Sequence, residues 1–181
     1  MFYTDEKTLA RYTASHRIWQ GVPTMERTAG GCFFAAWMSG GYKSYLGNCC
    51  VLTRSTDDGR TYSEPIAVAD VGPNGRCYDP CLWVDPRGRL WFFWAVQPEH
   101  AVWAACCDEP DAGILVWNKP RRIGYDVMCN KPTIGKEGEW LFPMTVWQVS
   151  VLGLSSPHVP GEYLFVSTDD GESFSVRGVT R

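Results

Sequence analysis

The 181-residue chain lacks the patterns that mark helical, membrane-spanning and nucleic-acid-binding proteins. No apolar run approaches the roughly 20 residues of a membrane-spanning helix, and no segment repeats its apolar residues with a useful helical period. Lys and Arg total 17 against 20 Asp and Glu, so the formal charge is −3. This balance offers no basic surface. We therefore expect no membrane and no nucleic acid among its partners.

Metal and cofactor motifs are also missing. Eight Cys and three His are present, but they form neither a C-x-x-C motif nor a cluster with zinc-finger spacing. The adjacent pairs Cys49-Cys50 and Cys106-Cys107 would point to opposite faces of a strand and so do not readily bridge. We expect small buried thiols in a reducing compartment, with no metal and no cofactor. A metal or redox role is the alternative.

The first seven residues, MFYTDEK, are polar and acidic, unlike a secretory signal. If Met1 is the true start, the sequence predicts a cytoplasmic protein. A truncated N-terminus would instead allow secretion or a periplasmic location.

Aromatic residues, glycine and proline are abundant, and they occur in a repeat. Nine Trp, eight Tyr and eight Phe stand with 18 Gly and 12 Pro, a composition typical of many short strands joined by turns. Pro23, Pro80 and Pro132 each begin a unit of apolar residues, a polar Gly turn and a strongly apolar strand, at spacings of 57 and 52 residues. Periods near 50 indicate four-stranded propeller blades. We predict an all-β fold with an N-terminal arm (1–16) and three blades (17–75, 76–126 and 127–181).

Two segments share the pattern S-x-D-x-G-x-[ST]-aromatic: residues 55–62, STDDGRTY, and residues 167–174, STDDGESF. The pattern predicts a tight turn in which Ser and Asp side chains bond backbone N–H groups, Gly supplies a positive φ, and the aromatic ring packs beneath. Each falls between the third and fourth strands of a predicted blade. Residues 108–113 of blade 2 form a degenerate copy.

The repeated turn resembles the Asp-box (BNR repeat) of the sialidase superfamily, where it is a peripheral folding device. Residues 19–27, 79–83 and 130–133 are also similar to bacterial exo-α-sialidase-like proteins. The resemblance implies a six-bladed propeller and hydrolysis of a terminal acidic sugar. It also implies that the chain is the N-terminal half of a longer propeller or a truncated product, because three blades leave open edges. Self-association is the alternative. Residues 1–16 would then belong to the closing strand of a blade that is absent.

The start of each innermost strand is where a propeller binds ligands, and it nominates the candidate residues. Asp79 is the first candidate catalytic acid, since Pro80 should hold its backbone extended and aim its side chain; a strand-capping role is the alternative. Glu26 is the candidate second carboxylate of a glycosidase, unless it pairs with Arg27 or Lys43. The candidate sugar-binding residues are Arg17, Gln20, Tyr78, Asn130 and Lys131.

The match to sialidases departs from the family at its functional residues. Sialidases open blade 1 with Arg-Ile-Pro, and aligning that Pro with Pro23 puts Gly21 where the Arg should be. The family's nucleophilic Tyr, its partner Glu and the other arginines come from later blades. We therefore expect an enzyme only of the full-length parent, with this chain inactive alone. A polysaccharide lyase, with a base such as His100, and a non-catalytic glycan-binding or inactive propeller remain open.

Overall fold

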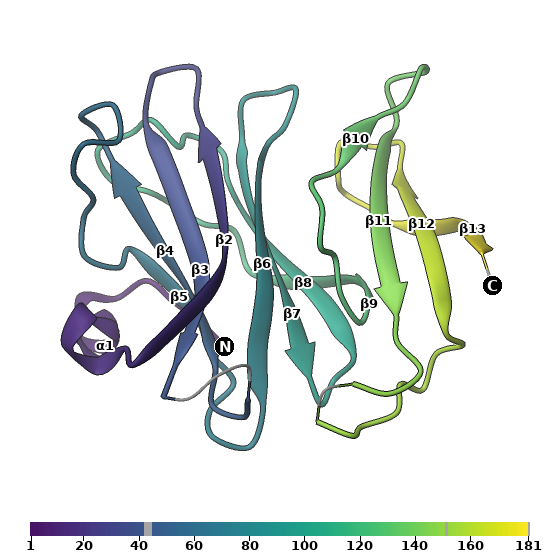
Figure 1. Cartoon of the computed structure of the whole chain (residues 1–181). Coiled ribbons are helices and arrows are strands. Elements are labelled where there is room, and N and C mark those ends of the chain that lie inside the picture. Colours follow the sequence, from purple (N-terminus) through teal and green to yellow (C-terminus); the bar gives the residue numbers. More distant parts are fainter. Residues whose placement is uncertain (42–44, 151, 181) are drawn as a thin grey trace.

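A computed structural model describes residues 1–41, 45–150 and 152–180, and nearly all of the regular secondary structure in these ranges is β-strand. Three antiparallel sheets stand side by side as successive blades, and the row of blades does not close into a ring (Figure 1). The all-β fold with three propeller-type blades is therefore confirmed.

Each blade is one continuous stretch of the chain, and the strand at the inner end of its sheet is β2, β6 or β10. Blade 1 has the strand order β1-β5-β4-β3-β2, made of β1 (Phe2–Tyr3), β2 (Trp19–Arg27), β3 (Phe33–Gly40), β4 (Cys49–Ser55) and β5 (Ala67–Ala69). Blade 2 has the order β6-β7-β8-β9, made of β6 (Arg76–Val84), β7 (Leu90–Gln97), β8 (Ala101–Cys107) and β9 (Arg121–Tyr125). Blade 3 has the order β10-β11-β12-β13, made of β10 (Thr133–Ile134), β11 (Trp140–Val146), β12 (Gly161–Ser167) and β13 (Ser175–Thr180).

The apolar core lies in the two spaces between blades. Alternate side chains of β3 and β4, such as Phe34 and Leu52, meet Phe92 and Trp94 of β7. The other face of β7 meets blade 3, where the indoles of Trp91 and Trp140 cross at 87° with centroids 5.9 Å apart. Because both faces of blade 2 are covered, all eight residues of β7 are buried. This explains why the sequence of that strand is a continuous apolar run.

The prediction that residues 1–16 belong to the closing strand of an absent blade is wrong. They complete and cover blade 1, since β1 pairs with β5 as an outer fifth strand. The short helix α1 (Glu6–Leu9) and the following 3₁₀ turns, η1 (Ala10–Tyr12) and η2 (Ala14–His16), come next. Leu9 and Tyr12 pack on Val51 and Val68, so the arm shields apolar surface of the end blade. In the described part of the chain, no helix is long and apolar enough to span a membrane.

The cysteines are free thiols, and seven of the eight are buried; Cys129 is exposed. Burial raises the pKa of the Cys81 and Cys106 thiols to about 12, so both stay neutral at physiological pH. The expectation of small buried thiols therefore holds for all but Cys129.

The two repeated segments, residues 55–62 and 167–174, have the same hydrogen bonds; they are called the first and second Asp-box turns below, after the pattern that they resemble. In the first, the N–H of Gly59 donates to Ser55 Oγ (3.0 Å) and that of Thr61 to Asp57 Oδ1 (2.9 Å). In the second, the N–H of Gly171 donates to Ser167 Oγ and that of Ser173 to Asp169 Oδ1, both at 2.9 Å. Both glycines have positive φ, at 77° and 84°. The turn predicted from the pattern thus forms twice.

The closing aromatic rings of the two turns differ. Phe174 packs edge-on against Phe142, with centroids 5.1 Å apart, as expected. Tyr62 is 38% exposed, and its hydroxyl lies 4.0 Å from the sulfur of Met25. The Phe174 ring is covered further by Arg121 of blade 2, whose guanidinium lies 5.4 Å from the ring centroid.

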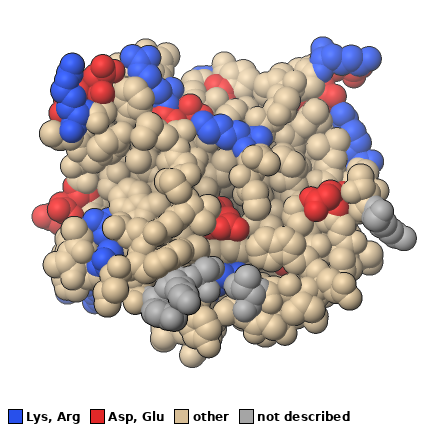
Figure 2. Space-filling view, viewed as in Figure 1, with Lys and Arg blue, Asp and Glu red and all other residues tan. Residues whose placement is uncertain are grey.

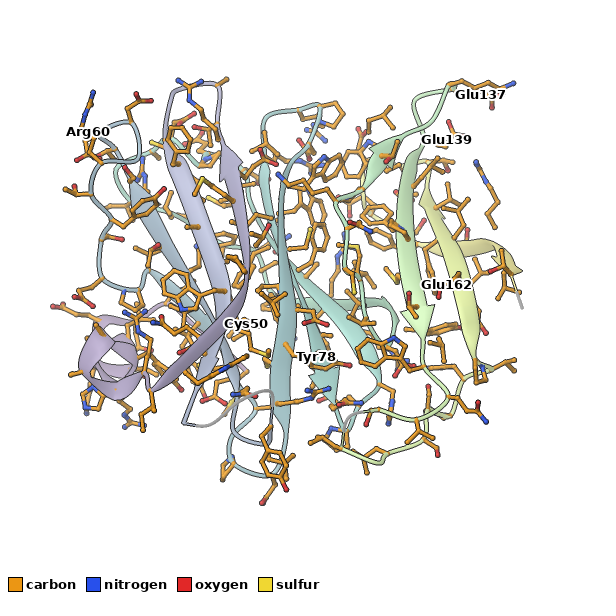
Figure 3. The ribbon with its side chains drawn as sticks, in the orientation of Figure 1. Cys50, Arg60, Tyr78, Glu137, Glu139 and Glu162 are labelled. Atoms are coloured by element: carbon orange, nitrogen blue, oxygen red, sulfur yellow. The ribbon has the colours of Figure 1, made fainter. Side chains whose placement is uncertain are left out.

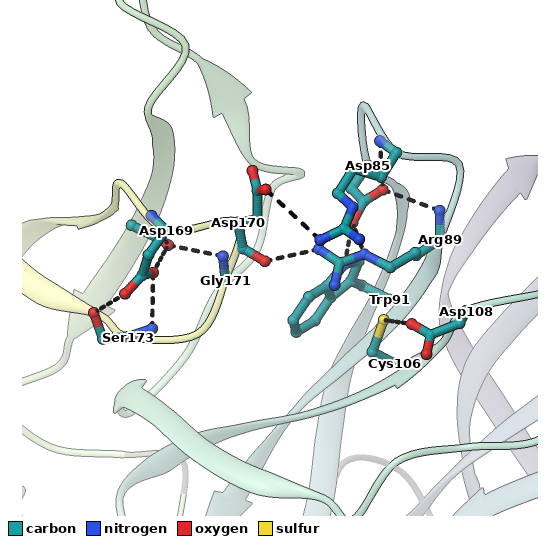
Figure 4. Close-up of polar contacts among 11 residues, drawn as sticks. Asp85, Arg89, Trp91, Cys106, Asp108, Asp169, Asp170, Gly171 and Ser173 are labelled. Atoms are coloured by element: carbon teal, nitrogen blue, oxygen red, sulfur yellow. Dashed lines mark hydrogen bonds and ion pairs between the residues drawn. The ribbon is translucent and has the colours of Figure 1, made fainter.

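The second Asp-box turn docks on blade 2 (Figure 4). Arg89 donates to the carbonyl oxygen of Asp170 at 2.7 Å, and Arg121 donates to the carbonyl oxygens of Gly171 and Glu172. A Cβ on Gly171 would lie only 2.8 Å from the indoles of Trp91 and Trp140, so no larger residue fits there. The degenerate copy docks on blade 1 in the same way, since Asp111 accepts from Thr28 and from the N–H of Gly30. The turn therefore joins consecutive blades.

The Asp169 carboxylate makes this turn sensitive to acid. Hydrogen bonds from the Ser173 hydroxyl and N–H lower the pKa of Asp169 from 3.8 to about 2. Because the pKa is lowered in the folded state, its stabilising contribution is present above pH 3.8 and is lost as the pH falls towards 2. We expect the melting temperatures of wild type and Asp169→Asn to differ at neutral pH and to converge over this window. Asp58→Asn, which removes an exposed carboxylate, is the control, and a difference that persisted at pH 2 would contradict the assignment.

Candidate functional site

The inner strands β2 and β6 carry matching backbone irregularities. Val22 and Asp79, each directly before a proline, have φ of 52° and 45°, and the ladder to the next strand shifts register at both. The expectation that Pro80 holds Asp79 extended is therefore wrong. A positive φ is strained for side-chain-bearing residues, most of all for β-branched Val22. Such strain is concentrated at functional sites, and here it re-aims the Asp79 side chain.

Asp79 lies half-buried beside a buried cation. Burial raises the pKa of the Asp79 carboxyl, and the charge of Arg76 opposes that shift. Arg76 is 1% exposed, donates through Nε to Gln97 Oε1 at 2.8 Å, and places its guanidinium 3.9 Å from the centroid of the Tyr78 ring. A carboxyl with a raised pKa next to a fixed cation suits a proton donor or a group that binds a polar ligand.

The floor beneath this pair is aromatic. Tyr78 is buried and packs with Met38 of blade 1 and Val127 of blade 3, while Trp19 and Trp147 lie partly buried against them. In Figure 3, Tyr78 lies low in the centre of the molecule, whereas Arg60 of the first Asp-box lies at the upper end. Because it packs with Met38 and Val127, the Tyr78 side chain is part of the apolar core between the blades. The Asp79 cluster and the first Asp-box lie far apart.

Glu26 is not close to Asp79. Its carboxylate accepts from Lys131 Nζ at 2.7 Å and from the N–H of Val84 at 3.3 Å. Val84 lies five residues beyond Asp79 on β6, about 15 Å along an extended strand. Glycosidase carboxylates lie about 5–9.5 Å apart, so the pairing of Glu26 with Asp79 is not what the structure shows.

Lys131 and Glu26 are engaged with each other instead. Lys131 also donates to the carbonyl oxygen of Met25 at 2.8 Å, so it ties the start of blade 3 to β2 of blade 1. Of the two alternative partners predicted for Glu26, only the backbone N–H of Arg27 contacts it, at 3.1 Å. Lys43 lies outside the described residues.

The remaining candidates have two different environments. Arg17 packs its guanidinium 5.1 Å from the centroid of Trp37, and its Nε and Nη1 are buried without a hydrogen-bond partner among the described residues. Gln20, on β2, and Asn130, ahead of β10, are exposed. The Tyr78 hydroxyl is a further buried group without such a partner. Arg17 lies on the face of blade 1 that the N-terminal arm covers, because Trp37 packs with Leu9 and the adjacent Met38 packs with Tyr78.

A buried polar cluster near Tyr78 was missed from the sequence. His100 and Asp126 are 5% and 2% exposed, and His100 Nδ1 lies 2.6 Å from Asp126 Oδ1. The other oxygen of Asp126 accepts from the Ser156 hydroxyl. His158 from the same segment stacks on Tyr125 with centroids 3.8 Å apart. Their spacing in the sequence carries no motif, so no signal could have found the cluster; His100 alone was named from the sequence, as a candidate lyase base. The burial of His100 does not favour it as a lyase base.

Charged groups are sparse around the site. In the space-filling view, most charged side chains lie towards the edges of this face, with an acidic group near its middle and a basic side chain across its upper part (Figure 2). The Asp79 cluster combines one carboxyl, the guanidinium group of Arg76 and several aromatic rings. Such a set binds a polar ring compound, with charges and amides on its hydroxyls and aromatic rings on its apolar faces.

Comparisons with known proteins agree on the fold. No family model and no curated protein matches the sequence. Among solved structures, the chain is similar to "Hadza microbial sialidase Hz136", with a TM-score of 0.65 and 15% identity over 92% of this chain and 39% of that one. It is also similar to a protein of unknown function from Dyadobacter fermentans DSM 18053, with a TM-score of 0.61 and 15% identity over 91% of this chain and 55% of that one. The chain thus spans about half or less of these proteins, and its blades have a sialidase-like fold.

Proposed function

We propose that this chain supplies part of a sugar-binding mouth in a sialidase-type glycoside hydrolase of six blades, with Asp79 as its central group. The single observation that carries the proposal is the environment of Asp79: a half-buried carboxyl of raised pKa, on strained backbone, beside buried Arg76. Sialidase-like fold and aromatic surroundings support a glycan as the ligand.

Asp79 suits the role of a proton donor to the leaving oxygen or of an acceptor for a sugar hydroxyl. A raised pKa keeps a larger share of the carboxyl protonated near neutral pH than an exposed Asp would have. The cation beside Asp79 is Arg76. Arg17 packs on Trp37, on the face of β3 opposite to the one that meets Tyr78, so it is not part of this proposed site.

A complete hydrolytic site needs a second catalytic group, and Glu26 is too far from Asp79 to serve. Glu26 and Lys131 instead link the end of β2 in blade 1 to the segment ahead of β10 in blade 3. The described residues therefore favour binding and proton donation, with the nucleophile or base supplied by residues beyond those described.

The test measures binding of N-acetylneuraminate and of glucuronate to the chain by isothermal calorimetry. We expect one of these acidic sugars to bind, and Asp79→Asn to weaken its binding at least tenfold, as expected for a lost charge-assisted hydrogen bond. Asp58→Asn is the matched control, because Asp58 also has a positive φ (61°) but lies exposed in the Asp-box. Binding that Asp79→Asn leaves unchanged, or no binding of either sugar, would overturn the proposal.

A further inference from the structure

A hollow lies on the face of blade 2 that is turned towards blade 1, where β1 meets this face. Its volume is about 470 Å³, and it is formed by β1, by the ends of β7 and β8, and by the segments flanking them. Volumes of this size are typical of small-molecule sites. None of the residues of the Asp79 cluster lines it.

The wall of this hollow is aromatic. Phe2 of β1 stacks on Trp94 with centroids 5.4 Å apart and planes within 7°. Trp94 is itself 3% exposed, so Phe2 covers it, and the partly buried ring of Trp103 is left at the wall. Phe2 and Trp103 therefore offer the accessible ring surface.

Two charged groups of opposite sign complete the lining. The Glu99 carboxylate is held by the indole N–H of Trp103 at 2.9 Å, which fixes its position at the edge of that ring. Lys119 is exposed and has no hydrogen bond or ion pair among the described residues. A fixed acceptor and an unengaged donor thus flank a mostly apolar wall.

We infer that this hollow binds a neutral pyranose sugar. Aromatic rings take the apolar face of a pyranose, a carboxylate accepts from its hydroxyls, and an ammonium donates to them. Acidic sugars fit less well, because Glu99 would repel their carboxylate. The site is separate from the Asp79 cluster, so the inference does not depend on the proposed function.

The experiment titrates the ¹⁵N-labelled full chain with methyl β-glucopyranoside and methyl β-galactopyranoside, and follows the indole N–H signals. The Trp103 signal, assigned by its loss in Trp103→Phe, reports directly on the hydrogen bond to Glu99. We expect it to shift saturably, with a dissociation constant of about 1–10 mM, the range of one weakly held ring. Glu99→Gln and Lys119→Met, both at exposed positions, should each weaken binding at least threefold.

Asp79→Asn is the control and should leave this titration unchanged. An unshifted Trp103 signal at the highest sugar concentration would overturn the inference. Sugar binding as tight as that of wild type in both Glu99→Gln and Lys119→Met would overturn it too. Binding of an apolar dye that the sugars do not displace would assign the hollow to apolar ligands and would equally overturn it.

Discussion

Replacement of Asp85 by Ala is expected to lower the free energy of unfolding by about 3–5 kcal/mol, the cost of breaking a buried charged network. The Asp85 side chain is fully buried in the hairpin between β6 and β7. Its Oδ1 accepts from the N–H of Arg87 and of Arg89, and its Oδ2 accepts from Arg89 Nε (2.6 Å) and Trp91 Nε1 (2.9 Å) (Figure 4). One side chain thus satisfies four donors.

The effect should reach beyond the hairpin, because Arg89 is the residue on which the second Asp-box docks. The Arg89 side chain is only 11% exposed. Without Asp85, its guanidinium would lose its counter-ion in this buried position, and the indole N–H of Trp91 would lose its acceptor. The interface between blades 2 and 3 would then weaken. Urea denaturation followed by tryptophan fluorescence measures the change.

Arg87→Ala is the matched control in the same hairpin. Its ion pair with Asp170 is 3.7 Å long, and both side chains are 59% exposed. Exposed pairs contribute about 0–1 kcal/mol, so this variant should stay close to wild type. A stability loss in Asp85→Ala no larger than that of Arg87→Ala would show that the buried network does not stabilise the hairpin.

Much of the fold was predictable, because local patterns carried it. The proline spacing and the Asp-box pattern depend on short segments whose backbone bonds are made with neighbours in sequence, such as Ser55 with Gly59. The N-terminal arm was not predictable in this way. Leu9 and Tyr12 are covered only because Val51 and Val68 lie opposite them in space, and no local pattern reports that contact.

The candidate site was less predictable, since its geometry comes from contacts between blades. Alignment on the prolines placed Asp79 and Lys131 at matching positions, but it contained no information about which residue each would meet. Lys131 reaches across to Glu26, a partner 105 residues away. The positive φ of Asp79 was hidden because a residue before proline ordinarily avoids it. The sequence therefore indicated which residue types lie at the blade starts, but not which of them contact each other.

Replacement of Asp126 by Ala is expected to cost about 2–4 kcal/mol, combining a lost buried acceptor with backbone strain. Asp126 joins His100 of blade 2 to Ser156 of the segment that leads to β12. It has a φ of 40°, which Ala tolerates less well than Asp. Because the neighbouring Val127 packs with Tyr78, release of residues 152–160 should also loosen the floor beneath Asp79. Hydrogen exchange of these residues, together with urea denaturation, measures both effects.

Two variants separate the hydrogen bonds from the strain. Asp58→Ala carries the same backbone penalty at a φ of 61° but removes only an exposed side chain. Ser156→Ala keeps the His100–Asp126 contact and loses one hydroxyl, so it should cost about 1 kcal/mol and still speed hydrogen exchange of residues 152–160. If Asp126→Ala matched Asp58→Ala in stability and left exchange of that segment unchanged, Asp126 would contribute only its backbone conformation. If instead it exceeds both, the cluster holds the segment from blade 3 in place beside the candidate sugar site.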